Sequence, residues 1–252
     1  MDRRLPRFIA TAKRLGYREI EVETNGTILS APGLSARLMG AGLTRAWVAV
    51  MHPENASNDR LTQDPGGASR TWAALSEAGA EGLPVGILIA VTPTNKEVLP
   101  DLVRRLVREA PSVDSLRFSV VAWQEEGTGY EGLETGLGRA CNAARKARLD
   151  FRFESAFAPP PCLFSARFVS LHTPLWASYY ATENSVDGRR ERLDACEDCA
   201  LVSRCPGLHA EVVEHRPDLI PSSCPSDEAM VAFRGQLGGV GRHLHAQVSR
   251  VT

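Results

Sequence analysis

Three cysteines lie close together in the stretch DACEDCALVSRCPGLHAE at residues 194–211. Cys196, Cys199 and Cys205 have the spacing Cys-x2-Cys-x5-Cys, in which a tight turn between the first two and a fold-back of the next segment direct three thiols toward one point. Soft thiolate ligands favour an iron-sulfur cluster or tetrahedral zinc, and both accept four cysteines. The spacing therefore predicts a metal site and leaves the choice of metal open.

The fourth ligand that we predict is Cys162, which follows three prolines in the stretch PPPCLF. Prolines restrict the backbone on one side of this cysteine and so lower the entropy that is lost when a metal binds. Cys224 in PSSCPS is the competing candidate, and His209 is a weaker one. The alternative to a metal site is a set of reduced, unligated cysteines in a small core.

Composition and charge define the class of protein in which these thiols must act. The chain has 252 residues, 43% hydrophobic, with 29 Lys and Arg against 30 Asp and Glu, so it can bury a core and has no overall field for nucleic acid or an anionic membrane. Its apolar runs are shorter than the roughly 20 residues of a membrane span, and MDRRLPRF lacks the apolar core of a secretion signal. We expect a cytoplasmic protein, where clustered cysteines bind metal more often than they form disulfides.

Helix and strand patterns alternate along the chain as far as the triple proline. Strands are predicted at residues 18–24, 45–51, 85–91, 115–121 and 151–155, and helices at about 5–15, 33–42, 69–79, 99–110 and 133–147. Val- and Ile-rich strands that are separated by helices imply right-handed crossovers and a mainly parallel sheet covered by helices. We therefore predict an α/β fold.

Polar residues follow these strands at their carboxyl ends, where ligands bind in parallel sheets. Glu23, Thr24 and Asn25 end the first predicted strand, and Asn95 follows the third. Asn25 has an alternative role, because it precedes Gly26 and can adopt the left-handed backbone of a turn. Asn95 can instead cap the helix that follows it.

The character of the sequence changes after the triple proline, where short segments carry five of the six cysteines. We predict a domain of residues 1–157 and a small cysteine-rich domain with a tail over residues 158–252. The sixth cysteine, Cys141, falls within a predicted helix, and we expect it to be a small buried thiol.

Three segments together resemble the radical S-adenosylmethionine (radical SAM) enzymes that carry a C-terminal SPASM or twitch domain. EIEVETNGTIL at 19–29 is similar to the third barrel strand and its turn, and residues 58–95 are similar to the stretch from a loop of the form hD-x-L-T-x-x-P-G to a strand that ends near Asn. CEDCALVSRCPG at 196–207 resembles the auxiliary motif C-x2-C-x5-C-x-G. The resemblance covers roughly residues 5 to 215.

The resemblance implies a partial (β/α) barrel of the radical SAM type, followed by a SPASM/twitch-like domain with an auxiliary [4Fe-4S] cluster on Cys162, Cys196, Cys199 and Cys205. It places S-adenosyl-L-methionine near Glu23, Thr24, Asn25 and Asn95. In that family a catalytic cluster reduces the bound sulfonium, and the resulting 5′-deoxyadenosyl radical takes hydrogen from a substrate that is often a peptide or a protein side chain.

The chain departs from the family in its catalytic part. It contains no Cys-x3-Cys-x2-Cys motif, its predicted sheet begins at the family's third strand, and Ala49 stands where the fourth strand often carries a serine. Either a preceding segment or partner chain supplies the missing part, which is the explanation we favour, or the protein is a degenerate relative without radical chemistry. Its own enzymatic activity and catalytic residues are thus left open. The alternative function is a non-catalytic module in which zinc or a cluster staples a docking surface for a partner.

Overall fold

The computed structural model describes residues 4–120, 134–154, 159–160, 162, 164, 190–199, 202, 205 and 207–215. It divides the chain into two compact units, one of residues 1–158 with 179–186 and the other of residues 159–178 with 187–252. The predicted domain boundary lies between residues 157 and 158. Within the described residues, no helix is long and apolar enough to cross a membrane.

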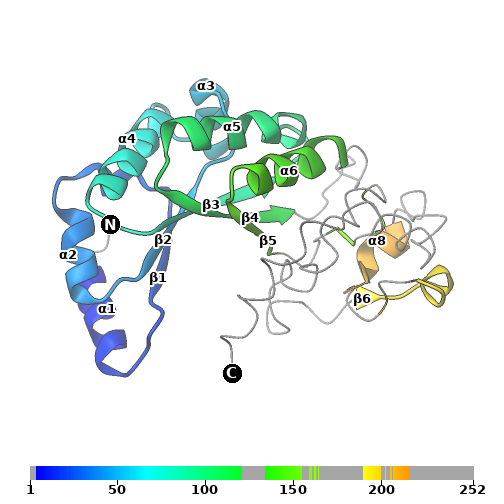
Figure 1. Cartoon of the computed structure of the whole chain (residues 1–252), viewed down its shortest axis with the longest axis horizontal. Coiled ribbons are helices and arrows are strands. Elements are labelled where there is room, and N and C mark those ends of the chain that lie inside the picture. Colours follow the sequence, from blue (N-terminus) through cyan, green and yellow to red (C-terminus); the bar gives the residue numbers. More distant parts are fainter. Residues whose placement is uncertain are drawn as a thin grey trace. The chain divides into compact units, whose positions relative to one another are not determined.

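The first unit alternates strands and helices, as Figure 1 shows. Its strands are β1 (Glu21–Thr24), β2 (Arg45–Ala49), β3 (Val85–Val91), β4 (Val113–Val120) and β5 (Asp150–Phe153). Its α-helices are α1 (Leu5–Arg14), α2 (Leu34–Ala41), α3 (Asn55–Thr62), α4 (Gly67–Ala80), α5 (Leu99–Glu109) and α6 (Arg139–Lys146). Shorter helical turns are η1 (Thr27–Ser30), η2 (Lys96–Val98) and the π-helical η3 (Glu134–Gly138).

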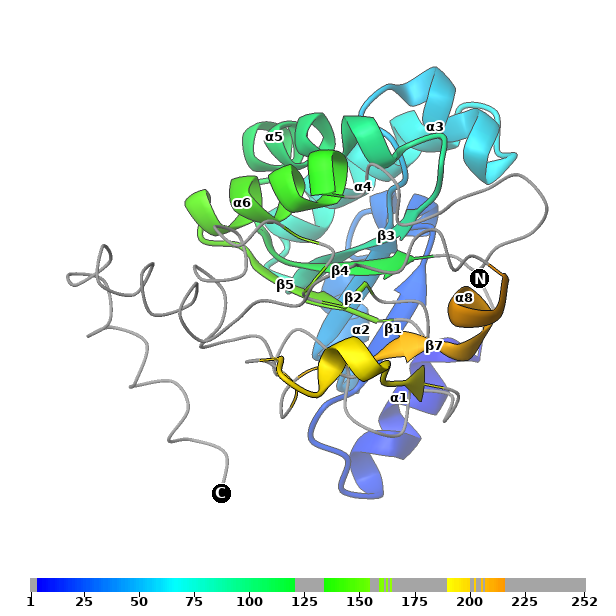
Figure 2. The ribbon, with the colours of Figure 1, turned by 90° about the vertical axis from the view of Figure 1, so that its right-hand side faces the viewer.

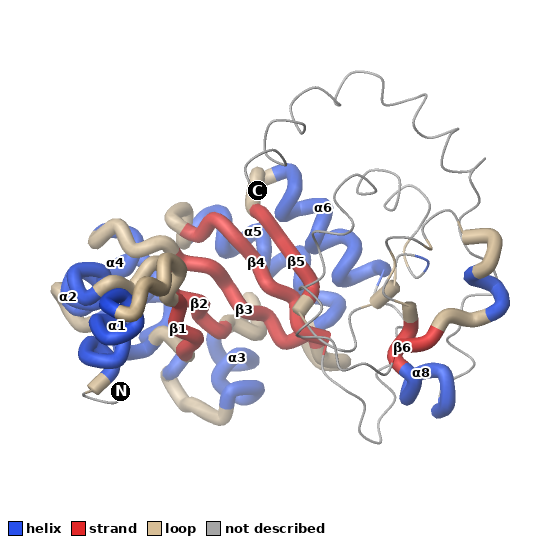
Figure 3. The backbone as a smooth tube through the Cα atoms, turned by 90° about the horizontal axis from the view of Figure 1, so that it is seen from below, coloured by secondary structure: helices blue, strands red, loops and turns tan. Residues whose placement is uncertain are grey.

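The five strands form one parallel sheet in the order β1-β2-β3-β4-β5. Figure 3 shows them side by side in this order. Each strand pairs with the next one along the chain, so right-handed crossovers place the connecting helices on a single face of the sheet. The predicted α/β class with a parallel, helix-covered sheet is confirmed. Sequential order is the pattern of a (β/α) barrel, whereas doubly wound sheets reverse their order at a switch point.

The hydrophobic core lies between this sheet and its helices. Figures 1 and 2 show α4, α5 and α6 together on one face. The strands contribute fully buried side chains to that face, among them Ile87, Ile89, Leu116 and Phe118. Helix α5 starts with Pro100 in its first turn and buries Leu99, Leu102, Val103 and Leu106, which recur at helical spacing and form one apolar stripe.

Several elements differ from the prediction: β2 ends at Ala49 rather than at residue 51, and the helix expected at about 133–147 is divided into η3 and α6. Helix α3 was not predicted, because its sequence NASNDRLT carries no apolar periodicity and buries only Ser57 and Asn58. The first strand was predicted from residue 18 but begins at Glu21. Before it, the backbone of Ile20 is bound by the Thr44 hydroxyl, which accepts from the Ile20 N–H and donates to its carbonyl, both at 2.9 Å. The Thr44 backbone N–H also donates to the Ile20 carbonyl at 2.8 Å, so both the backbone and the side chain of Thr44 hold the chain just before β1.

The described part of the second unit is small. It contains β6 (Arg190–Glu191), the 3₁₀ turn η7 (Asp194–Cys196), β7 (Leu208–His209) and α8 (Ala210–His215). Strands β6 and β7 pair antiparallel, with Arg190 opposite His209 and Glu191 opposite Leu208. Figure 2 draws the segment after β6 in yellow, and β7 and α8 in orange.

Candidate functional site

The face of the sheet that lies opposite the helices is polar, and we call it the inner face. Alternate residues of the strands meet there, namely Glu21, Glu23, Arg45, Trp47, Arg117 and, just after β5, Glu154. Successive side chains of a strand point to opposite faces of the sheet. These residues alternate with the buried apolar residues along the strands, so they lie on the opposite face. A parallel sheet covered on both faces would be apolar on both, and this one is not.

Trp47 anchors the middle of the inner face. Its side chain is buried and lies over Gly86, where a Cβ atom would meet the ring at 2.2 Å. The indole N–H donates to Glu21 Oε2 at 2.9 Å, and the guanidinium carbon of Arg117 lies 3.5 Å from the ring centroid. A cation over an indole face contributes about 0.5–2 kcal/mol. Gly86 and Arg117 therefore hold the ring from its two sides.

Arg117 is shared by three carboxylates. Its side chain is 13% exposed and lies 2.9 Å from Glu21 Oε2, 3.4 Å from Glu23 Oε1 and 2.9 Å from Glu154 Oε1. Burial raises the pKa of the Glu154 carboxyl, Arg117 and Arg152 act against this, and the charges of Glu23 and Glu21 raise it further. The inner face thus gathers three carboxylates around one largely buried guanidinium. Such a group is suited to binding a cation or exchanging a proton.

A second ion pair closes the amino end of the same face. Arg45 binds Asp114 through both of its terminal nitrogens and also donates to the Ser115 hydroxyl at 2.8 Å. The hydrogen bond to Asp114 raises the pKa of Arg45, against the effect of burial. Burial opposes ionisation of Asp114, but hydrogen bonds from Arg45 and Ser115 outweigh it and hold the pKa of that carboxyl below its usual value. This pair is a structural link between β2 and β4.

The residues that were predicted at the strand ends have different surroundings. Glu23 belongs to the Arg117 cluster, and its side chain is 60% exposed. The Thr24 hydroxyl accepts from the Gly26 N–H at 3.1 Å, and Asn25 Oδ1 accepts from the Thr27 hydroxyl at 3.1 Å, so both shape the turn. The left-handed residue is Gly26, with φ +80°, and Asn25 is not among the described non-glycine residues with positive φ. The alternative role considered for Asn25 is therefore wrong.

Asn95 is completely buried and joins the ends of two strands. Its side-chain amide donates to the carbonyls of Met51 at 2.8 Å and Ala90 at 2.7 Å, and its oxygen accepts from the Thr92 N–H at 2.8 Å. It makes no side-chain capping bond to η2, so that alternative is also wrong. With its amide occupied by backbone groups, Asn95 positions the edge of the sheet.

Asn58 and Asp59, which were not predicted from the sequence, also bind backbone groups through their side chains. Asn58 Oδ1 accepts from the N–H groups of Met51 and His52, at 2.8 and 3.2 Å. The Asp59 carboxylate accepts from the N–H groups of Gly66 and Ala68, both at 2.7 Å, at the start of α4. The negative charge of Asp59 and the amino end of the helix stabilise one another. The sequence signal for this loop is its resemblance to the form hD-x-L-T-x-x-P-G, in which Asp59 is the acidic residue.

Cys196, Cys199 and Cys205 lie on the segment between β6 and β7, which we call the cysteine turn. The N–H of Cys199 donates to the Cys196 carbonyl at 3.1 Å, and the N–H of Gly207 donates to Cys205 Sγ at 3.4 Å. Gly207 has φ +84°, and a Cβ atom there would lie 2.6 Å from the Glu191 carbonyl oxygen. The C-x-G motif thus needs a glycine at position 207, because the last residue of β6, Glu191, lies close to it.

The Cys205 thiol is affected by burial and by the groups around it. Burial raises the pKa of Cys205 to about 11, the Gly207 N–H and Arg190 lower it, and the thiolates of Cys199 and Cys196 raise it. The described cysteines are all free of disulfides. Nevertheless, the described residues contain no group of three or more His, Cys, Asp or Glu side chains placed to hold a metal ion.

The other cysteines and the histidine that were considered lie in different parts of the chain. Cys162 is half-buried and belongs to the same unit as the turn, and His209 is buried within β7. Cys224 lies outside the described residues. Cys141 is completely buried in α6, and burial raises the pKa of its thiol well above the usual value, so the expectation of a small buried thiol is confirmed.

Comparison with models of protein families gives no match to this chain, and comparison with curated proteins gives none either.

Proposed function

We propose that this chain is a radical SAM-type protein in which a partial (β/α) barrel is joined to a unit that binds an auxiliary [4Fe-4S] cluster. Cys162, Cys196, Cys199 and Cys205 are its ligands in this proposal. The observation that carries it is the spacing of Cys196, Cys199 and Cys205 on the segment that joins the paired strands β6 and β7.

The chemistry of the turn fits such a cluster. Thiolates are the ligands of iron-sulfur clusters, and an N–H donated to sulfur, as from Gly207 to Cys205, tunes the clusters that such ligands hold. Because thiols must be deprotonated to bind a metal, the affinity of such a site would rise with pH. A bound cluster would supply one-electron transfer.

The first unit supports the barrel part of the proposal. Its strands follow one another in sequential parallel order, and its inner face carries charged residues at the carboxyl ends, where (β/α) barrels bind their ligands. Of the four residues assigned to S-adenosyl-L-methionine by resemblance, Glu23 offers an exposed carboxylate. Thr24, Asn25 and Asn95 hold the loops around it. By the same resemblance, the substrate is a peptide or a protein side chain.

Anaerobic reconstitution with iron and sulfide tests the metal directly. We expect a brown protein with broad visible absorption and about four irons per chain. Cys199→Ser should lose most of the iron, whereas the matched change Cys141→Ser, in a helix of the first unit, should keep it. Equal iron in the two variants would refute the cluster.

The fourth ligand is tested by a second pair of variants. Cys162→Ser should lower the iron content and Cys224→Ser should not, and the reverse result would assign Cys224. A colourless protein that holds one tightly bound zinc per chain would instead support the alternative function, a metal-stapled module that docks a partner.

A further inference from the structure

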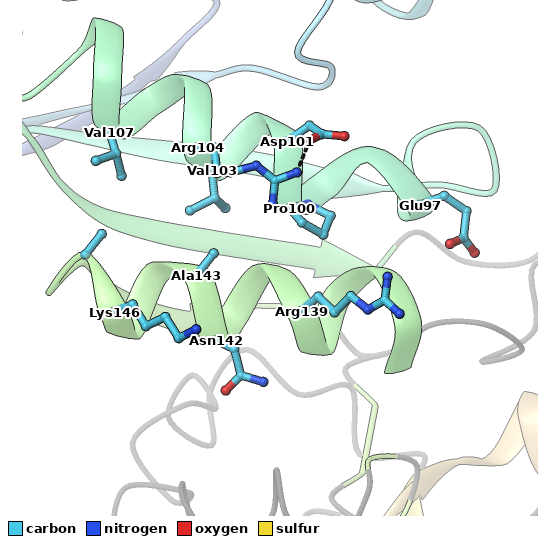
Figure 4. Close-up of a pocket in the computed structure, with 11 residues that line it drawn as sticks. Glu97, Pro100, Asp101, Val103, Arg104, Val107, Arg139, Asn142, Ala143 and Lys146 are labelled. Carbon is cyan, nitrogen blue, oxygen red and sulfur yellow. Dashed lines mark hydrogen bonds and ion pairs between the residues drawn. The ribbon is translucent and has the colours of Figure 1, made fainter.

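A groove runs along the outer surface of the first unit between α5 and α6. Its volume is about 760 Å³, within the range of about 300–1,000 Å³ that ligand sites occupy. Figure 4 shows Pro100 and Val103 of α5 and Ala143 of α6 between the two helices. Val107 continues this apolar floor and is 44% exposed, which makes it one of the few large apolar side chains left open to solvent among the described residues.

Basic side chains border this floor. Arg139 and Lys146 line the groove from α6, one toward each end, and Arg104 lines it from α5. Arg104 is neutralised by an ion pair with Asp101. Within the described part of the chain, Arg139 and Lys146 form no ion pair, so the α6 side of the groove carries two uncompensated positive charges. Glu97 lies at the end near Arg139 and weakens the positive charge there.

We propose that this groove docks an acidic amphipathic helix of a partner protein. The two helices that form it follow neighbouring parallel strands and so run in the same direction, which leaves a straight trough for a third helix. Apolar side chains of the partner occupy the floor, and its carboxylates meet Arg139 and Lys146. This surface lies outside the inner face and the cysteine turn, so the inference goes beyond the proposed function.

The geometry specifies the partner's pattern. Arg139 and Lys146 are seven residues apart on one helix, about 10 Å along its axis. A helix lying along the groove matches them with two glutamates at positions i and i+7 and fills the floor with leucines at i+3 and i+4. A second copy of this chain fits poorly through α1, because Arg7 and Arg14 accompany its exposed Phe8 and bring like charge to the groove.

Fluorescence anisotropy with the full chain and a labelled helical peptide of the pattern Glu-x2-Leu-Leu-x2-Glu tests the proposal. We expect this peptide to bind about tenfold more tightly at low salt than the same peptide with both glutamates replaced by glutamine. Lys146→Glu should weaken its binding about five- to tenfold, because it reverses one of the two charges. Glu97→Gln should strengthen binding about twofold, because it removes the opposing charge at the Arg139 end.

The matched control is Arg145→Glu, which makes the same charge change one residue away on α6, at an exposed position that does not line the groove. It should alter the affinity less than about twofold. Equal binding of the two peptides, equal effects of Lys146→Glu and Arg145→Glu, or absence of binding would overturn the proposal. Self-association of the chain that Lys146→Glu abolishes would also overturn it, since the occupant would then be a second copy.

Discussion

At the scale of single residues, the inner face depends on one aromatic ring held between a glycine and a guanidinium. Trp47 reaches across β3 only because Gly86, its neighbour in the sheet, has no side chain. Arg117 can stay largely buried because it faces both the ring and three carboxylates. Loss of the guanidinium would leave the carboxyl group of Glu154 in a poorly solvated place without its compensating charge, so Arg117 holds the cluster together.

Gly86→Ala should therefore destabilise the protein by about 1–3 kcal/mol, because its Cβ atom would overlap the Trp47 ring. Urea denaturation followed by Trp fluorescence measures this change. The matched control is Gly40→Ala, an exposed helical glycine with open space around it, which should be neutral or stabilising by up to about 1 kcal/mol. Equal effects of the two substitutions would show that Trp47 does not lie over Gly86.

Through Glu154, the stability of the folded protein should depend on pH. Its pKa is raised in the folded state, first by burial, so the folded protein binds this proton more tightly than the unfolded chain does. Its contribution to stability is complete below the unfolded pKa of about 4.3 and falls as the pH rises through the folded pKa. Glu154→Gln should thus raise the melting temperature at pH 7 and leave it nearly unchanged at pH 4. A variant less stable than the parent at pH 7 would mean that the Arg117 ion pair outweighs burial.

At the scale of elements, short polar side chains hold the loops at the carboxyl edge. Asn95 connects the end of β3 to the segment after β2, Asn58 binds that same segment from α3, and Asp59 binds the start of α4. Asn95 and Asn58 satisfy backbone groups beyond or at the ends of β2 and β3, and Asp59 satisfies N–H groups at the start of a helix. These hydrogen bonds hold the loops at the carboxyl ends of the strands in place, near the exposed carboxylate of Glu23.

Asn95→Ala should cost about 2–4 kcal/mol, because three backbone groups lose their partner in a buried site. Amide hydrogen exchange should speed up at Thr92, whose N–H is bound by the Asn95 oxygen. Asn25→Ala serves as the comparison, since the side chain of this exposed residue bonds only within its turn and its loss should cost about 1 kcal/mol or less. If both asparagines cost the same, Asn95 does not join the two strand ends.

Much of this fold could be predicted, because hydrophobic periodicity locates the elements that build the core. Helix α5 and strand β3 follow from their apolar patterns alone. Helix α3 could not be predicted, since polar contacts rather than an apolar stripe hold it. At the site, Glu23 was found from its place at a strand end, but Arg117 and Glu154 come from distant strands that only the sheet register brings together.

At the scale of the whole molecule, the two faces of the sheet in the first unit differ: one packs the apolar core and the other carries charged side chains. The helix-covered face is apolar and packs Phe118, Phe151 and Phe153 with ring centroids 6.3–6.4 Å apart. The inner face carries the charged cluster, and Cys196, Cys199 and Cys205 belong to the second unit. The residues that build the core are thus distinct from the charged cluster and from these three cysteines.

If the proposed auxiliary cluster exists, the 252-residue chain by itself should not cleave S-adenosyl-L-methionine even with dithionite and that cluster filled. Cleavage needs an iron with an open coordination position, and the four cysteine ligands of the proposal would leave none. The six cysteines of this sequence include no Cys-x3-Cys-x2-Cys set that would leave such a position. Anaerobic incubation of the purified, reconstituted chain with cofactor, followed by chromatography for 5′-deoxyadenosine, should give no more product than a control without protein. Turnover that depends on Cys199 or Cys205 and survives in Cys141→Ser would mean that the turn at residues 196–205 holds a three-cysteine catalytic cluster rather than an auxiliary one.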